Sequence, residues 1–514
     1  MSTDSRSGLV WDYSGIDPEP KWASEPSIEA IETTCRRVLQ LGALDDCSVS
    51  FKAEGGFNRV YLVEDSWERK WIFRVSLPLD PHNKTTGEVA TLCWLERLLD
   101  IPTPRVIAFD DSSDNDIGYE WMLMDLMPGT SAHFRWRGMS WEAKMTFTKK
   151  VAECQAQIFN SSKFSGIGTL KDVSLDSDAE LELGQLVLPG MVWGSRYNFD
   201  LPRGPFRSSH DWLKAILSFT IEGQKEIIGE DSDCGSDSDS SSDSDSTDSS
   251  GSDSSSSSDS SSDSDDSSDS GYTSDSSSSS DSSSSSDSDS SSNSDDSSDS
   301  VSDSDDSSDS DSDRGDKEYA RASLTVARML LGLLPDIFPK TQAHLERTVL
   351  YHEDLSLNNI LVDDDGAITA IIDWECASAV PIFATTHWPN FLVGHDREEE
   401  PDRDYYADAD PEFEAQSRIL DGYHYLESEG KNPLYWDHLM EYEQTKLRKI
   451  YSDRLSELCP AWGRAFADDG LKKDYHEGVL RCDGTWLLRN IAAWVRAVNG
   501  GEFPTMYEMM SRRV

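Results

Sequence analysis

Three side chains that carry oxygen atoms follow one another in the stretch HEDLSLNNILVDDDGAITAIIDWE, which begins at His352. Asp354 comes first, Asn359 follows five residues later, and Asp373 lies nineteen residues after Asp354. Carboxylate and amide oxygens suit a hard cation such as Mg²⁺, which takes a few protein ligands and completes its shell with phosphate and water. We therefore expect Asn359 and Asp373 to hold a metal, and Asp354 to accept the proton of an attacking hydroxyl.

A β-hairpin is the element that would bring these residues together. Two short apolar runs, 360–362 and 368–372, flank DDDG, which is rich in turn-forming residues. If Asp363 pairs with Thr369, the register places Asn359 opposite Asp373, with Cα atoms about 4.5–5.5 Å apart. A carboxylate for the hydroxyl and an Asn–Asp pair for the metal is the layout of kinase-type phosphoryl transfer. A hairpin with a purely structural role is the alternative.

Two neighbouring residues have two interpretations each. His352 either braces the catalytic loop through hydrogen bonds, without a chemical step, or is an ordinary core histidine. Glu375 either orients the metal loop or is a surface carboxylate.

The region before residue 129 predicts a small α+β unit. Residues 48–65 predict two strands around a turn at Glu54, Gly55 and Gly56, and 70–78 predict a third strand. Apolar residues at helical spacing predict a helix over 84–100, and 119–130 predict another strand.

The charge of the chain is concentrated in one tract. The formal charge is −51, and residues 231–313 carry 26 Asp with no Lys or Arg, which leaves −25 on the rest. A tract of Ser and Asp cannot bury an apolar face, so we expect it to be disordered. It is interpreted as a solvated spacer, as a tail that acidophilic kinases phosphorylate and basic proteins bind, or as a weak Ca²⁺ sink through carboxylate and phosphate oxygens.

The tract predicts how the chain divides. Helical spacing on both sides, over 210–229 and 317–339, indicates an insertion between two helices. The expected parts are an N-terminal segment (1–47), the small α+β unit (48–128), a first mainly helical part (129–230), the disordered tract (231–313), and a second mainly helical part that contains the hairpin (314–514).

Composition argues against several classes. An acidic chain lacks the basic patches that nucleic-acid phosphates require. No apolar window reaches the ~18 residues of a membrane span, and no basic region precedes an apolar run at the N-terminus. The eight scattered cysteines form no CxxC pair and are expected to be reduced thiols. We expect a cytoplasmic protein that binds neither nucleic acid nor membrane.

The stretch from His352 to Glu375 resembles the catalytic signature of the aminoglycoside phosphotransferase-like kinases, a family related to choline kinases. EGGFNRVYLV resembles the family's nucleotide loop, and YEWMLMDLMPG resembles its entry into the hinge. FSGIGTL and GPF, which begin at Phe164 and Gly204, resemble pieces common in its fungal members. The resemblance implies a two-lobed, protein-kinase-like α+β fold with ATP and Mg²⁺ in the cleft, in which 48–128 is the nucleotide-binding N-lobe and 129–230 and 314–514 form the C-lobe with the catalytic loop. It also implies a set of nucleotide contacts: Gly55, Gly56, Asn58, Arg74, Glu88, Met124, Asp125 and Met127.

One position departs from the family pattern. Arg74 stands where the family usually has a lysine that holds the α- and β-phosphates; a guanidinium can grip phosphate oxygens by two bonds. Arg74 is expected to pair with Glu88, although Thr85 to Glu88 also fits a capping box. A surface arginine is the alternative for Arg74, and a plain turn is the alternative for the two glycines.

Further residues could shape the substrate pocket. The acidic stretch Asp396 to Glu414 either attracts an amine-bearing substrate or is a solvated loop. Trp193, Trp388 and Trp436 either line a pocket or pack in the core. The function expected is transfer of the γ-phosphate of ATP to a hydroxyl of a small molecule, with an inactive kinase-fold binding or scaffold protein as the alternative. The missing D-F-G and A-P-E motifs argue against a protein kinase.

Overall fold

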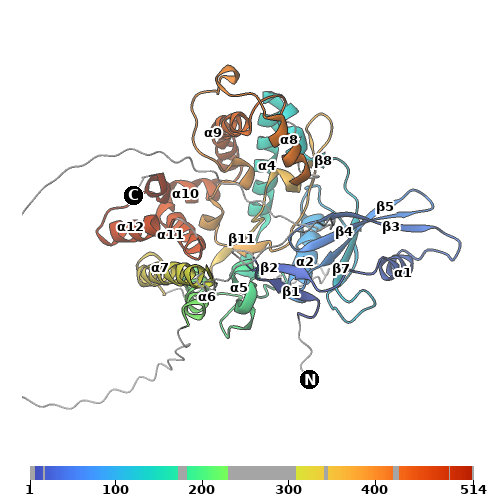
Figure 1. Ribbon diagram of the computed structural model, residues 1–514, viewed down its shortest axis with the longest axis horizontal. Coiled ribbons are helices and arrows are strands. Elements are labelled where there is room, and N and C mark those ends of the chain that lie inside the picture. The colour runs from blue at the N-terminus through green and yellow to red at the C-terminus, as the bar shows by residue number, and fades with distance from the viewer. Residues whose placement is uncertain are drawn as a thin grey trace, which may run out of the picture.

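The computed structural model describes residues 6–14, 18–171, 182–229, 308–340, 345–420, 426, 428–484 and 487–511. The chain forms a strand-rich N-terminal lobe and a larger, mainly helical lobe (Figure 1). The predicted two-lobed α+β fold class is confirmed. Of the tract predicted at 231–313, residues 231–307 lie outside the described residues, and helix α7 begins at Ser308.

The N-terminal lobe is built on a five-stranded antiparallel sheet with the order β3-β4-β5-β7-β6. Its elements are α1 (Ile28–Val38), β3 (Cys47–Glu54), β4 (Asn58–Asp65), β5 (Lys70–Ser76), α2 (Asn83–Leu98), β6 (Val106–Asp110) and β7 (Glu120–Asp125).

Side chains alternate between the two faces of this sheet, as the period of two along a strand requires. Leu123 joins a core with Ile31 of α1, whereas Met122 and Met124 join the core that contains Val89 and Leu95 of α2. Both faces are therefore covered by a helix.

The start of α2 differs from the expected capping box. The helix begins at Asn83, so Thr85 lies inside its first turn, where its Oγ1 donates to Glu120 Oε2 at 2.5 Å. The capping-box interpretation is wrong because the buried Glu120 carboxylate engages the threonine hydroxyl instead.

A ribbon that the sequence did not predict precedes the sheet. Strands β1 (Leu9–Asp12) and β2 (Glu19–Trp22) pair antiparallel. Trp22 packs edge-on against Tyr119 of the N-terminal lobe, with ring centroids 5.0 Å apart. Trp11 contacts Trp193 of the helical lobe at 5.2 Å, so the ribbon touches both lobes.

The helical lobe contains most of the remaining elements. Its helices are α3 (Ala132–Arg135), α4 (Trp141–Ser161), α5 (Pro189–Val192), α6 (Ser209–Ile228), α7 (Ser308–Ile337), α8 (Pro411–Leu420), α9 (Pro433–Leu458), α10 (Pro460–Asp468), α11 (Gly470–Arg481), α12 (Leu488–Asn499) and α13 (Met506–Ser511). Its strands are β8 (Thr130–Ser131), β9 (Phe164–Ser165), β10 (Gly168–Thr169), β11 (Arg347–Tyr351), β12 (Ile360–Val362), β13 (Ile368–Ile371) and β14 (Ser378–Val380).

Two helix pairs organise this lobe: α4 packs along α9, and α6 packs along α7 (Figure 1). The described cysteines are free thiols. Within the described part of the chain, we find no helix with the length and apolar character needed to cross a bilayer.

Candidate active site

The predicted hairpin exists, with β12 and β13 as its arms, but its register differs from the expected one by one residue at Ile360 and by two residues at Val362. Ile360 pairs with Ile371, so Asn359 lies opposite Ile372, whose N–H donates to Asn359 O at 2.9 Å. The expected Asp363–Thr369 pairing is wrong because the Asp363 carboxylate accepts the N–H groups of Asp365 and Ala367 at 3.0 and 2.8 Å. These bonds close the turn earlier, as an Asp at a turn commonly does.

Asp373 still lies next to Asn359, one residue past the end of the pairing. Its φ of +62° is the left-handed conformation, which is uncommon for residues other than glycine. Such backbone conformations concentrate at functional sites. This turn directs the chain out of β13 and carries Asp373 away from the strand.

The carboxylate of Asp354 is oriented by two asparagines. Asn359 Nδ2 donates to Oδ2 at 2.8 Å, and Asn390 Nδ2 donates to Oδ1 at 2.7 Å. Asn359 is buried, whereas Asp354 is exposed. Because the Asn359 amide nitrogen is directed at Asp354, its amide oxygen is the atom left to face a cation.

Asp373 is connected to the N-terminal lobe through Arg74. Arg74 Nη1 lies 3.3 Å from Asp373 Oδ1, and Arg74 Nη2 pairs with Glu88 of α2. The expected ion pair between Arg74 and Glu88 is confirmed, and both side chains are buried. Arg74 Nε is buried without a hydrogen-bond partner among the described residues.

A second cation, Lys84 of α2, lies beside this group. Its Nζ is 2.7 Å from Glu375 Oε2 and 3.0 Å from Asn58 Oδ1. Asn58 Nδ2 donates to the same Glu375 oxygen at 2.8 Å. Glu375 is thus no surface carboxylate: it joins the segment after Asp373 to the N-terminal lobe.

The two acids of this segment have opposite pKa shifts. Burial raises the pKa of Asp373 to about 6, and the charge of Glu375 adds to the rise. Burial also acts to raise the pKa of Glu375, but the charges of Lys84 and Arg74 and the bond from Asn58 outweigh it and hold that pKa near 2. At neutral pH both are therefore carboxylates, of which Asp373 is the better placed to accept a metal.

His352 supports the segment around Asp373 through contacts with the residues on either side of it. Its Nε2 lies 3.1 Å from Ile372 O, and its ring packs against Trp374 with centroids 4.5 Å apart. Burial lowers the pKa of His352, so the neutral ring with Nε2–H donating is the form that fits. The geometry agrees with a bracing role.

The nucleotide loop and the hinge contain the remaining expected contacts. Gly55 and Gly56 form the exposed turn between β3 and β4, and a Cβ at either would meet nothing within 4 Å. Met124 is packed in the core beside α2, and Asp125 pairs with Arg105 at 3.1 Å. Met127 is half-buried just beyond β7. The side chains of Asn58, Met124 and Asp125 are thus engaged within the protein.

The three tryptophans separate into different environments. Trp388 packs against Tyr451 and Phe466 in the core, and Trp193 contacts Phe57 of the nucleotide loop at 6.0 Å. Trp436 lines a cavity of about 150 Å³ together with Leu357 and Glu443.

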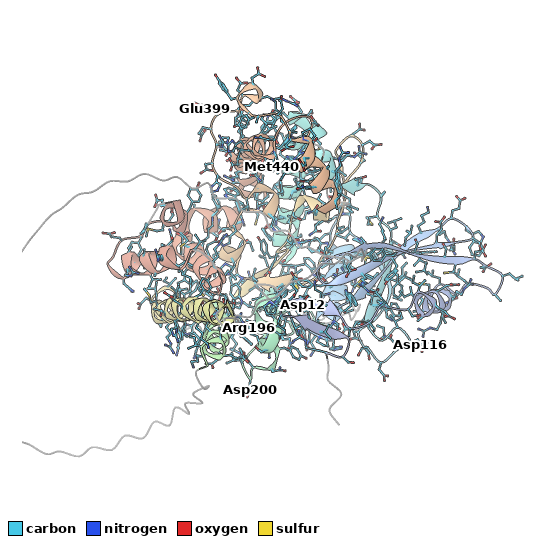
Figure 2. All side chains as sticks on the ribbon, viewed as in Figure 1. Asp12, Asp116, Arg196, Asp200, Glu399 and Met440 are labelled. Carbon is cyan, nitrogen blue, oxygen red and sulfur yellow. The ribbon has the colours of Figure 1, made fainter. Side chains whose placement is uncertain are left out.

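The acidic stretch 396–414 lies along the outer part of the helical lobe. Asp396 pairs with Arg448, and Asp408 pairs with Lys431 at 2.8 Å. Figure 2 shows Glu399 at the upper tip of the helical lobe, far from Asp116 of the N-terminal lobe. These positions fit the solvated-loop interpretation better than a pocket wall.

Lys84 and Asn390 join the site although the sequence did not single them out. The spacing of Lys84 four residues before Glu88, on one helix face, was the only available signal. Asn390 follows a stretch without a recognisable pattern.

The donor set fits Mg²⁺. Among the described residues, no three His, Cys, Asp or Glu side chains converge on a metal site. Mg²⁺ does not require such a cage, because one or two carboxylates together with substrate phosphates and water complete its shell. One carboxylate, one amide oxygen and the unpaired Arg74 Nε beside them suit a cation that arrives with phosphates.

Comparison with known proteins gives a family match to stretches of both lobes. Residues 50–146 and 302–385 match the phosphotransferase enzyme family (APH). A subtelomeric hrmA-associated cluster protein of Aspergillus fumigatus is 31% identical over 166 residues, which cover 30% of this chain and 32% of that protein. The altered inheritance of mitochondria protein 9 of Meyerozyma guilliermondii is 27% identical over 136 residues, 25% of this chain and 22% of that protein.

The chain therefore matches about a third or less of the length of these curated relatives. Among solved structures, ADP-bound aminoglycoside phosphotransferase APH(2'')-Ib has 12% identity and a TM-score of 0.39, covering 91% of this chain and 96% of that one. The two matched stretches contain the Arg74–Glu88 pair and the hairpin from Asp354 to Asp373, so the similarity to the phosphotransferase enzyme family includes the candidate site.

Proposed function

We propose that this protein transfers the γ-phosphate of ATP, with Mg²⁺, to a hydroxyl group of a small molecule. One observation carries the proposal. Asp354 and Asn359 bond to each other at one arm of the hairpin, while Asp373, leaving the other arm, bonds to the Arg74–Glu88 pair.

Each side chain has a role that its position supports. Asp354 accepts the proton of the substrate hydroxyl as the hydroxyl oxygen attacks the γ-phosphorus of ATP, and the bond from that phosphorus to the bridging oxygen breaks to release ADP. Asn390 and Asn359 hold the Asp354 carboxylate in place. Asn359 and Asp373 would hold the metal. Bound Mg²⁺ and ATP would supply the transferable phosphoryl group and the neutralisation of its charge.

The nucleotide is assigned to the N-terminal lobe. Arg74, which pairs with Glu88, would hold the phosphates. The backbone at Gly55 and Gly56 would approach the phosphates, and the main chain around Met124 to Met127 would receive the adenine. Amine-bearing hydroxyl compounds are the first substrates to test, because the chain outside residues 231–313 still carries a formal charge of −25, which attracts cations.

A catalytically inactive binding or scaffold protein is the second candidate. The observation that favours it is that Arg74 is already engaged by two carboxylates, Glu88 and Asp373. In that case the tract at 231–313 would serve basic partner proteins or acidophilic kinases.

Binding and turnover together separate the candidates. We expect Mg–ADP to bind by calorimetry and Asp373→Ala to abolish the Mg²⁺-dependent part of that affinity. On a panel of amino alcohols and aminoglycosides, Asp354→Asn should lower kcat by about 10²–10⁴-fold, the usual contribution of a general base. Asp364→Asn is the matched control, because Asp364 lies in the same hairpin with its side chain 91% exposed.

Two results would contradict the proposal. Absence of Mg–ADP binding in the wild-type protein would leave only the second candidate, a binding or scaffold protein. Full turnover in Asp354→Asn would show that Asp354 is not the base. The cytoplasm is the proposed compartment; since a relative is named as mitochondrial, subcellular fractionation decides between the two.

A further inference from the structure

We propose that Lys84 is a positioning residue that ties helix α2 to the segment 373–375 through Glu375. The proposal rests on the proposed function, because that segment is where the metal would be held. Lys84 belongs neither to the Arg74–Glu88 pair nor to the hairpin, so the proposal assigns a role to a further residue.

The contacts of Lys84 form a small closed network. Lys84 Nζ, Asn58 and Glu375 bond to one another at 2.7, 2.8 and 3.0 Å. Ser76 Oγ donates to Asn58 Oδ1 at 3.2 Å, so strands β4 and β5 both support the network. The Lys84 side chain is only 3% exposed, and that of Glu375 is 12% exposed.

A contribution to stability alone does not account for this arrangement. The cost of desolvating two charges largely offsets the attraction of a buried ion pair, so such a pair is weak evidence for stability. The pair does fix a distance: it sets the first turn of α2 against the residue two positions after Asp373.

The structure contains a second link between the same two elements. Glu88 lies one turn after Lys84 on the same face of α2. Glu88 pairs with Arg74, and Arg74 contacts Asp373. The segment 373–375 is thus attached to α2 at two points, on either side of the buried Trp374.

The link through Lys84 and Glu375 and the link through Glu88, Arg74 and Asp373 are expected to respond differently to bound phosphates. If Arg74 holds phosphates and Asp373 holds the metal, the contact between Arg74 and Asp373 would be exchanged for contacts to those groups. Lys84 and Glu375 are not required in either contact. Their link therefore holds α2 and the segment in register while the Arg74 link is exchanged.

Helix α2 has other anchors, which makes the proposal testable by substitution. Thr85 bonds to Glu120, and Val89, Leu92 and Leu95 are packed in the core. Replacing Lys84 should therefore leave the fold intact. If Lys84→Met does not fold, Glu375→Gln carries the same test, because its amide still accepts from Asn58.

The first measurement is hydrogen–deuterium exchange on the full chain without nucleotide. We expect Lys84→Met to speed exchange in both 82–90 and 373–378, and Glu375→Gln to do the same. Lys70→Met and Glu64→Gln are matched controls, because they remove an exposed pair, 3.4 Å apart, in the same lobe. Exchange that changes only in the segment carrying the substitution would overturn the proposal.

The second measurement separates positioning from general stability. Lys84→Met should weaken Mg–ADP binding about tenfold, as the loss of one charge-assisted bond would, and leave ADP binding in EDTA within about twofold. Lys84→Arg should restore part of the loss. Equal weakening with and without Mg²⁺ would overturn the proposal. If the wild-type protein binds no Mg–ADP, the proposed function fails, and the exchange measurement alone decides the role of Lys84.

Discussion

Each carboxylate oxygen of Asp354 accepts a hydrogen bond from a different asparagine. Asn359 comes from the same loop, and Asn390 comes from the segment that follows β14. Two donors on opposite oxygens fix the rotation of the carboxylate about its own axis. A base that must meet a hydroxyl proton at hydrogen-bond distance depends on such an orientation.

Asn390→Ala should therefore reduce kcat by about 10²-fold, because small misplacements of a reacting group have effects of that size. The KM for ATP should change little, since Asn390 bonds to Asp354 and not to Arg74 or Asp373. Steady-state kinetics on the substrate found in the panel measures both. Asn160→Ala is the control: it removes a hydrogen bond from Asn160, at the end of α4, to Leu458 O, at the end of α9. An equal loss of kcat in Asn160→Ala would refute the role assigned to Asn390.

Glu477 of α11 gives the protein an acid-sensitive contact. It lies 3.1 Å from His387 and pairs with Arg481. Burial acts to raise its pKa, but the bond from His387 and the charges of His387 and Arg481 outweigh it, so the pKa falls to about 2. His476 lies beside His387 and is neutral there, because burial lowers its pKa to about 3.

The lowered pKa of Glu477 determines how its contribution to the free energy of unfolding changes with pH. A folded-state pKa below the ordinary value of about 4.3 means that ionised Glu477 stabilises the fold fully above that pH. The stabilisation is lost as the pH falls from about 4.3 toward 2. At pH 6, Glu477→Gln should lower the free energy of unfolding by about 1–3 kcal/mol, and the difference from wild type should shrink by pH 3.

Urea denaturation at several pH values measures this difference. Glu457→Gln is the control, since Glu457 is 67% exposed and surface pairs contribute about 0–1 kcal/mol. A gap between wild type and Glu477→Gln that stays constant from pH 6 to pH 3 would contradict the assignment.

At the scale of elements, the hairpin of β12 and β13 depends on a third strand. β8 pairs with β12, with Leu361 opposite Ser131. The chain reaches β8 through Gly129, whose φ is +104°. A Cβ on Gly129 would lie 2.7 Å from Val362 O, a contact that backbone atoms cannot relieve.

Gly129→Ala should consequently destabilise the protein by about 1–3 kcal/mol, through backbone strain and displacement of β12. The free energy of unfolding in urea measures the effect. Gly138→Ala is the matched control, because a Cβ there meets nothing within 4 Å. Equal stability of the two variants would show that β8 does not constrain the hairpin.

The elements also show what the sequence could predict. The arms of the hairpin and strands β3, β4, β5 and β7 follow local patterns and match the predicted ranges, whereas β6 was not predicted as a strand. The register difference in the hairpin was not predicted either, because it depends on which N–H groups the Asp363 side chain accepts. The sequence does not distinguish Lys84 from other helix lysines, because its partner Glu375 lies in the other lobe and far along the chain. The four-residue strands β1 and β2 are too short for their pattern to show.

At the scale of the molecule, the Ser/Asp tract enters between two helices that pack on each other, α6 and α7 (Figure 1). Their pairing does not require a long connection. Deleting residues 240–300 should therefore preserve the fold and Mg–ADP binding, and raise the free energy of unfolding by about 1 kcal/mol through lower loop-closure entropy.

Chemical denaturation and calorimetry of the deletion variant check this expectation. A Gly/Ser segment of the same length in place of 240–300 is the control that separates loop length from charge. Loss of folding in the deletion variant, but not in the Gly/Ser variant, would show that α6 and α7 need a long connection.

The β1–β2 ribbon has a consequence for how fast a ligand exchanges. It is anchored by Trp22 on Tyr119 in one lobe and by Trp11 on Trp193 in the other. Trp193 also contacts Phe57, so the anchor in the helical lobe lies against the nucleotide loop. If the proposed nucleotide enters when the two lobes move apart, the paired strands β1 and β2 restrict that movement because they contact both lobes. Trp11→Ala, which removes the contact with the helical lobe, should then shorten the residence time of the proposed nucleotide.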